Sequence, residues 1–223
     1  MKNKIIILAM IILFSVTINT DNVIAEESKN DSTIAEMDGV INYQENMGET
    51  GEYYVLNCPN YYQQDYKDIA FGDSTIGEQG NLLTCLASLE TFYLTKDVNP
   101  ETFVGVHSED CLQGVKTLNK NSIREYSEYF GTALDVQSYD FDTMAKYVKR
   151  YSAKVLIHVP HASALGKQSS YFLITGITKD GFVVVDPNKE NLKYAHDSED
   201  GYIYDPLFIS LVCGKSSEMY IFH

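Results

Sequence analysis

The spacing of apolar residues changes from helical to strand-like in the second half of the chain, and this change constrains the fold most. In the first half, residues 81–94 are predicted to form a buried helix that begins at Gly80-Asn81, because their apolar side chains recur at helical intervals. Three more helices are predicted at Asn99-Pro100-Glu101, at 122–130 before Gly131, and at 142–151.

Strand-forming runs dominate after residue 153. Three runs are rich in β-branched and aromatic residues, at 154–159, 171–175 and 182–185, and Asp180-Gly181 is a hairpin signal between the last two. We also expect an early strand at 53–56, a late helix at 205–212 and a final strand at 219–222. Helices followed by an antiparallel sheet predict an α+β fold.

The first 25 residues have the pattern of a secretory signal peptide. Lys2 and Lys4 precede an apolar run, and Val23-Ile24-Ala25 precedes Glu26. The apolar run, residues 5–18, is shorter than the roughly 20 residues that span a bilayer. We therefore predict a signal peptide at 1–25, an acidic flexible leader at 26–52 and a folded domain at 53–223, in a secreted or extracellular protein that can associate with the cell surface.

Charge limits the classes of partner. The chain has 17 basic and 31 acidic residues, for a formal charge of −14. Removal of residues 1–25 takes away two Lys and one Asp, which leaves 15 basic and 30 acidic residues and a charge of −15. A basic patch for nucleic acid is not expected. An anionic membrane surface would repel the mature chain, and no membrane insertion is expected after signal cleavage. Cationic peptides or polymers are the favoured partners.

Four cysteines, Cys58, Cys85, Cys111 and Cys213, lack the paired spacing of a zinc site. No metal or other cofactor is expected. An exported protein can form disulfides, but the spacing of these cysteines does not indicate which of them would pair, so the pairing stays open.

Three ordered blocks then resemble the papain-like cysteine peptidases of the bacteriocin-leader-processing, double-glycine type. The blocks are Gln64-Asp65-Tyr66 with Phe71-Gly72, Thr75-Ile76 and residues 80–87; residues 170–176; and Val185-Asp186-Pro187. The resemblance covers about residues 61–222. It implies a papain-like fold in which N-terminal helices pack on an antiparallel sheet.

The resemblance also implies where a catalytic site would lie. The family has a cysteine nucleophile at the helix start and a basic histidine at a strand start, and these positions hold Asn81 and Ser170. Asp186 matches the orienting acid, and Gln64, or Gln63 one place earlier, matches the oxyanion-hole amide. Without the thiol and the imidazole, the cysteine-peptidase reaction is predicted to be lost. Asn81 is predicted to cap its helix.

The leading hypothesis is a secreted, catalytically inactive pseudo-peptidase that binds a peptide or protein in the former substrate cleft. A second hypothesis is an active cysteine peptidase or amidase with a rearranged site at Cys85 and His161. Cys85 lies four residues beyond Asn81 among leucines, so it is expected to be buried with a raised pKa. A third hypothesis is a structural component of the cell surface. Data on its localisation and its binding partners would distinguish this third hypothesis from the first.

Overall fold

The computed structural model describes residues 54–55, 58–112, 118–160, 165 and 169–223. The predicted signal peptide and leader lie outside these residues, as does His161. All described residues belong to one compact unit.

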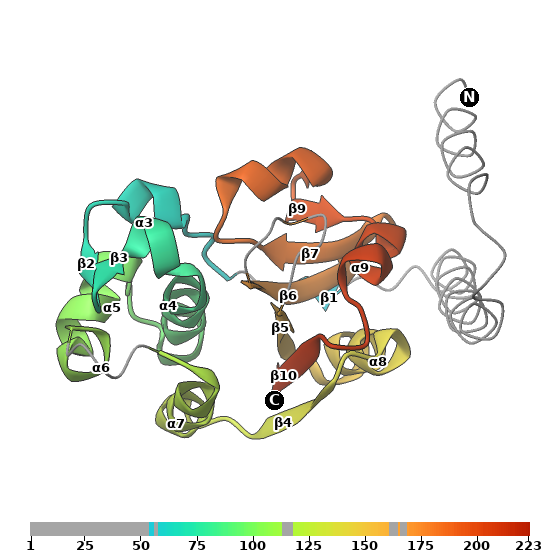
Figure 1. Ribbon diagram of the computed structural model, residues 1–223. Helices are drawn as coiled ribbons and strands as arrows, with labels where there is room; N and C mark the ends of the chain where they lie inside the picture. The colour runs from blue at the N-terminus through green and yellow to red at the C-terminus, as the bar shows by residue number, and fades with distance from the viewer. Residues whose placement is uncertain (1–53, 56–57, 113–117, 161–164, 166–168) are drawn as a thin grey trace, which may run out of the picture. The chain divides into compact units, whose positions relative to one another are not determined.

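An antiparallel sheet forms the centre of this unit (Figure 1). Within the described residues it has eight strands, of which seven follow the order β4-β10-β5-β6-β7-β9-β8. The long central strand is β6, and β1 pairs with it beyond the end of β5, where Val55 lies opposite Gly176. The strands are β1 (Tyr54–Val55), β4 (Leu134–Ser138), β5 (Lys154–Val159), β6 (Ser170–Thr178), β7 (Gly181–Val185), β8 (His196–Ser198), β9 (Gly201–Tyr204) and β10 (Glu218–Phe222).

One face of the sheet is covered by the helices that precede it in the chain. They are α3 (Ile76–Gln79), α4 (Asn81–Leu94), α5 (Pro100–Val106), α6 (Ser108–Leu112) and α7 (Lys120–Phe130), with the small hairpin of β2 (Ala70–Phe71) and β3 (Ser74–Thr75) beside them. Leu83, Leu86 and Leu89 of α4 are fully buried against this face. Leu156 and Leu173 of the sheet meet them there.

The opposite face is covered by α8 (Phe141–Tyr151) and α9 (Pro206–Val212). Val155 and Ile157 of β5 point to this second core, whereas Leu156 between them points to the first. This alternation is the two-residue period of a strand, and burial on both faces explains why the residues of β5 to β7 are mostly apolar. Two 3₁₀ helices, η1 (Gln63–Tyr66) and η2 (Lys189–Tyr194), lie outside the two cores.

The predicted α+β fold, with helices packed on an antiparallel sheet, is confirmed. The helix at 81–94 and the strand at 154–159 have the predicted bounds, and the Asp180-Gly181 turn joins β6 to β7. Gly131 ends α7 with a φ of 71°, a left-handed conformation that glycine adopts without strain. The structure adds α3, α6, β4, β8 and β9, which the sequence did not indicate.

Candidate functional site

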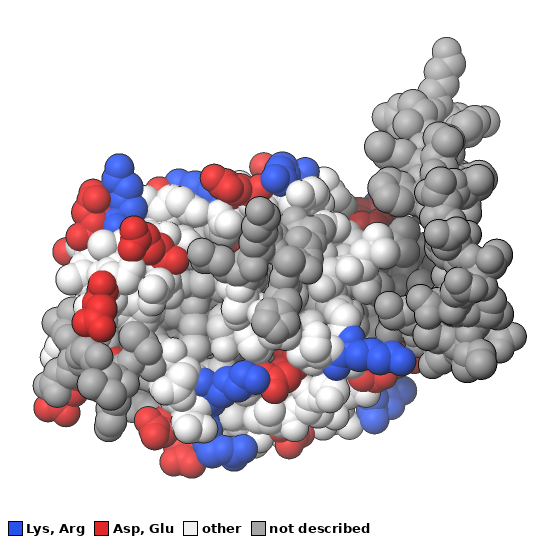
Figure 2. Space-filling model, viewed as in Figure 1, with Lys and Arg blue, Asp and Glu red and all other residues white. Residues whose placement is uncertain are grey.

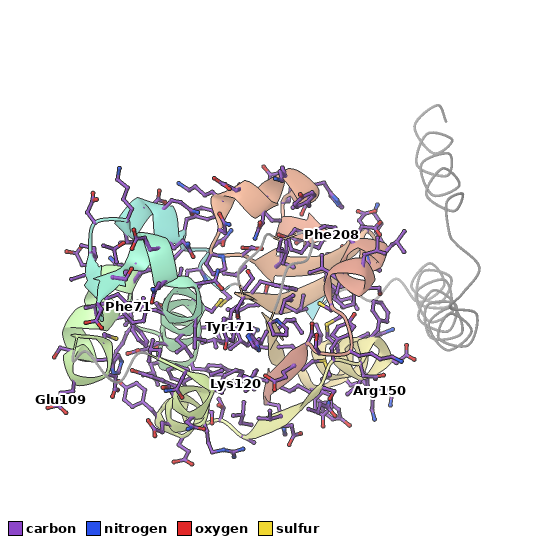
Figure 3. All side chains as sticks on the ribbon, in the orientation of Figure 1. Phe71, Glu109, Lys120, Arg150, Tyr171 and Phe208 are labelled. Carbon is purple, nitrogen blue, oxygen red and sulfur yellow. The ribbon has the colours of Figure 1, made fainter. Side chains whose placement is uncertain are left out.

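A cleft of about 820 Å³ opens where the start of α4 meets the start of β6. Its volume is within the range of small-molecule and peptide pockets. Figure 3 shows Tyr171, at the start of β6, beside α4. The described residues that line the cleft are Gln63, Glu78, Gln79, Asn81, Leu82, Leu118, Leu165, Ser169, Ser170, Tyr171, Asn188 and Glu190.

Asn81 joins the two sides of this cleft. Its Oδ1 accepts a hydrogen bond from the backbone N–H of Tyr171, and its Nδ2 donates to Gln63 Oε1 at 3.3 Å. The prediction that Asn81 caps its helix is wrong. Gly80 is the N-cap residue of α4 and Asn81 is the first helical residue, because α3 and the bond from Gly80 N to Ile76 O carry the chain directly into α4.

The adjacent residues Gln63 and Gln64 bond to different parts of the structure. Gln63 lies against Asn81 in the cleft, and its own amide donates to Gly77 O at 3.0 Å. Gln64 instead bonds to the loop after β7, with Nε2 at 2.6 Å from Asn188 Oδ1. Gln63, the second of the two candidates, is therefore the glutamine that meets the helix start. A single-residue step along a 3₁₀ helix turns the side chain away, and the sequence does not reveal that direction.

Ser170 lies at the same cleft as Asn81, as the resemblance predicts for a strand start beside a helix start. Ser170 is 7% exposed. The next residue, Tyr171, makes the backbone bond to Asn81. The family-matched helix and strand positions thus converge in one place.

Asp186 lies deeper, with no exposed surface. Its carboxylate accepts hydrogen bonds from Asn191 Nδ2, from the hydroxyl of Tyr204 at 2.8 Å and from the backbone N–H of Asn188. Burial raises the pKa of Asp186 to about 6, although these three partners act in the opposite direction. In this arrangement Asp186 holds the loop after β7 against the sheet.

Cys85 does not face the cleft. It is fully buried among the leucines of α4, and burial, with the nearby Asp186 and Cys58, raises the pKa of its thiol well above the usual value. A protonated thiol in an apolar core is a poor nucleophile. Its proposed partner, His161, is outside the described residues. All four cysteines are unpaired in the structure.

The sequence did not point to three further side chains: Ser169, which lines the cleft, and His158 and Glu218, which are joined to it by hydrogen bonds. His158 is on β5, where the sequence showed only a strand run, and Ser169 Oγ lies 2.8 Å from its Nε2. A histidine within a mostly apolar strand was the signal that the sequence offered. Its partners depend on strand register, which the sequence does not show.

Within the described residues, no group of three or more His, Cys, Asp or Glu side chains is placed to hold a metal ion. No helix in that part of the chain has the length and apolar character needed to cross a membrane.

No protein-family model and no curated protein matches this chain. Among solved structures, the chain is similar to a protein from Bacillus anthracis that is provisionally described as a C39-like peptidase. The two are 14% identical, the match covers 76% of this chain and 97% of that chain, and the TM-score is 0.46.

Proposed function

We propose that this protein is an exported peptide-binding protein, built on a papain-like peptidase fold that has lost cysteine-dependent catalysis. The observation that carries the proposal is the position of Asn81. At the junction of α4, Gln63 and the start of β6, the chain has a carboxamide that is bonded to both neighbours. A carboxamide cannot serve as the nucleophile of a thiol peptidase.

The composition of the cleft supports a peptide ligand. Its lining is mostly uncharged and polar, with carboxamides from Gln63, Gln79 and Asn188 and apolar contacts from Leu82 and Leu118. Carboxamides both donate and accept hydrogen bonds, as a peptide backbone requires.

The charge of the cleft favours a cationic peptide. Glu78 and Glu190 line it, and no Lys or Arg is among the described lining residues. On the face shown in Figure 2, Lys and Arg side chains are dispersed around the periphery instead of forming one patch. The two cleft carboxylates, and the overall negative charge, would attract basic side chains.

Binding of short labelled peptides to the purified protein, followed by fluorescence polarisation, tests this proposal. A lysine-containing decapeptide should bind more tightly than its glutamate-containing counterpart, and the difference should shrink as salt is raised. Replacing Glu78 or Glu190 by Gln should weaken binding of the lysine peptide by about two- to fivefold each, the effect of one partly screened ion pair.

Glu109→Gln is the matched control, because Glu109 is an exposed carboxylate on α6 at a distance from the labelled Tyr171 (Figure 3). This variant should bind the lysine peptide as the unaltered protein does. If no peptide of either charge binds, or if Glu109→Gln weakens binding as much as Glu78→Gln does, the proposed peptide site is wrong.

A further inference from the structure

Ser169, His158 and Glu218 are joined in a linear chain of contacts beside the cleft. Ser169 Oγ is 2.8 Å from His158 Nε2, and His158 Nδ1 is 3.2 Å from Glu218 Oε2. We propose that these residues form a serine-hydrolase centre, with Ser169 as the nucleophile toward an ester or amide carbonyl, His158 as the base and Glu218 as the orienting acid. None of them is a family-matched position.

The backbone register of the sheet builds this arrangement. Glu218 lies directly opposite His158 on β10, and Tyr171 lies opposite His158 on β6. Residues opposite each other in antiparallel strands have Cβ atoms about 5 Å apart, so the acid and the base are held within contact distance. The ring of Tyr171 stacks on the imidazole, with 4.5 Å between the ring centroids and 20° between the planes.

The proposed base and nucleophile differ in exposure as a hydrolase requires. His158 is 6% exposed, whereas Ser169 is exposed and lines the cleft. The base is therefore shielded from bulk water, and the hydroxyl can reach a ligand in the cleft.

Glu218 is held as a carboxylate. Its Oε2 forms an ion pair with Lys120 and accepts a hydrogen bond from the hydroxyl of Tyr220 at 3.1 Å. Partial burial raises the pKa of Glu218, but hydrogen bonds from Lys120, His158 and Tyr220 lower it by more, and the net pKa is below the usual value. A carboxylate accepts a hydrogen bond from the N–H of Nδ1, which leaves Nε2 of a neutral imidazole as the acceptor for the Ser169 hydroxyl.

The proposed hydrolysis needs only these three side chains and water, without a cofactor. Ser169 Oγ forms a bond to the carbonyl carbon, and its proton moves to His158 Nε2. The tetrahedral intermediate collapses, the bond to the leaving alcohol or amine breaks, and that group takes the proton from His158. Water attacks the acyl-enzyme with the same imidazole as base, which releases the acid and restores the Ser169 hydroxyl. The positive end of the α4 dipole, at Asn81 and Leu82, faces the same cleft and favours negative charge on the carbonyl oxygen.

A serine-directed fluorophosphonate probe, with mass spectrometry to locate the adduct on the purified full chain, tests this inference. It does not rest on peptide binding, because the probe requires no peptide. The expected result is an adduct on Ser169, its absence in Ser169→Ala, and a rate lowered about a hundredfold or more in His158→Gln. Ser216→Ala removes an exposed hydroxyl in the turn before β10 and should leave labelling unchanged.

Because His158 is buried, His158→Gln could lose activity simply by failing to fold, so a second measurement uses variants that keep His158. In Ser169→Cys the new thiol should react with iodoacetamide at neutral pH about tenfold or more faster than in Ser216→Cys, because only the first has an adjacent base. The inference is overturned if no adduct forms on Ser169, if labelling of Ser169 persists at full rate in folded His158→Gln, or if the two introduced thiols react equally. These results would leave the peptide-binding proposal standing.

Discussion

The buried carboxyl of Asp186 makes the stability of this protein depend on pH in a direction opposite to that of most carboxylates. Its pKa is about 6 in the folded protein, compared with 3.8 for a free side chain, and burial is the largest cause. The folded state therefore binds the proton more tightly than the unfolded state. The resulting stabilisation is complete below about pH 4 and is lost as the pH rises through about 6.

The size of this effect follows from the two pKa values. A difference of about 2 units corresponds to about 3 kcal/mol in total, of which about 1.4 kcal/mol lies between pH 5 and pH 7.5. Asp186→Asn removes the titrating group while keeping its size. The free energy of unfolding of the unaltered protein, minus that of Asp186→Asn, should thus be about 1.4 kcal/mol larger at pH 5 than at pH 7.5.

Urea denaturation followed by circular dichroism at the two pH values measures this difference, provided that the slopes with denaturant agree. Tyr204→Phe is the companion variant. It removes a donor that lowers the pKa of Asp186, so it should extend the loss of stability to higher pH. Equal differences at both pH values, or a larger difference at pH 7.5, would refute the assignment of Asp186 as a carboxyl governed by burial.

Two further predictions concern the helical core. Cys85 is expected to resist iodoacetamide in the folded protein and to react in urea, because its thiol is buried and its pKa is raised. Alkylation of Cys85 within minutes at neutral pH in the folded protein would instead support the hypothesis of a rearranged cysteine site. Leu83→Ala, at a fully buried position of α4, should lower the free energy of unfolding by about 3 kcal/mol, whereas Leu211→Ala, at a residue of α9 that is 71% exposed, should change it by less than about 0.5 kcal/mol in the same urea assay.

The elements that carry a strong apolar period were predictable from the sequence. The leucines of α4 and the mostly apolar run of β5 are each visible within a single segment of sequence, and both segments are buried. In contrast, β4 was missed because it is only five residues long and mostly exposed, with Leu134 and Val136 as its only apolar residues. The short strands β8 and β9 gave too few residues for a pattern.

The candidate site was predictable in part. The family resemblance around Asn81 and Ser170 implied that a helix start lies next to a strand start, and the two positions do line one cleft. The choice of Gln63 over Gln64, and the bridging bonds of Asn81, depend on side-chain directions at the end of η1 and at the junction of α3 and α4. Neither direction is encoded in a local pattern.

The sequence by itself determined the α+β class, the main helices and strands, and the absence of a cysteine at the start of α4. Only the tertiary structure decided which polar side chains meet. Ser169, His158 and Glu218 come from three separate parts of the chain, and His158 and Glu218 are 60 positions apart. Such residues become neighbours only when β5, β6 and β10 pair in one register, and that register is selected by burial of both faces of the sheet.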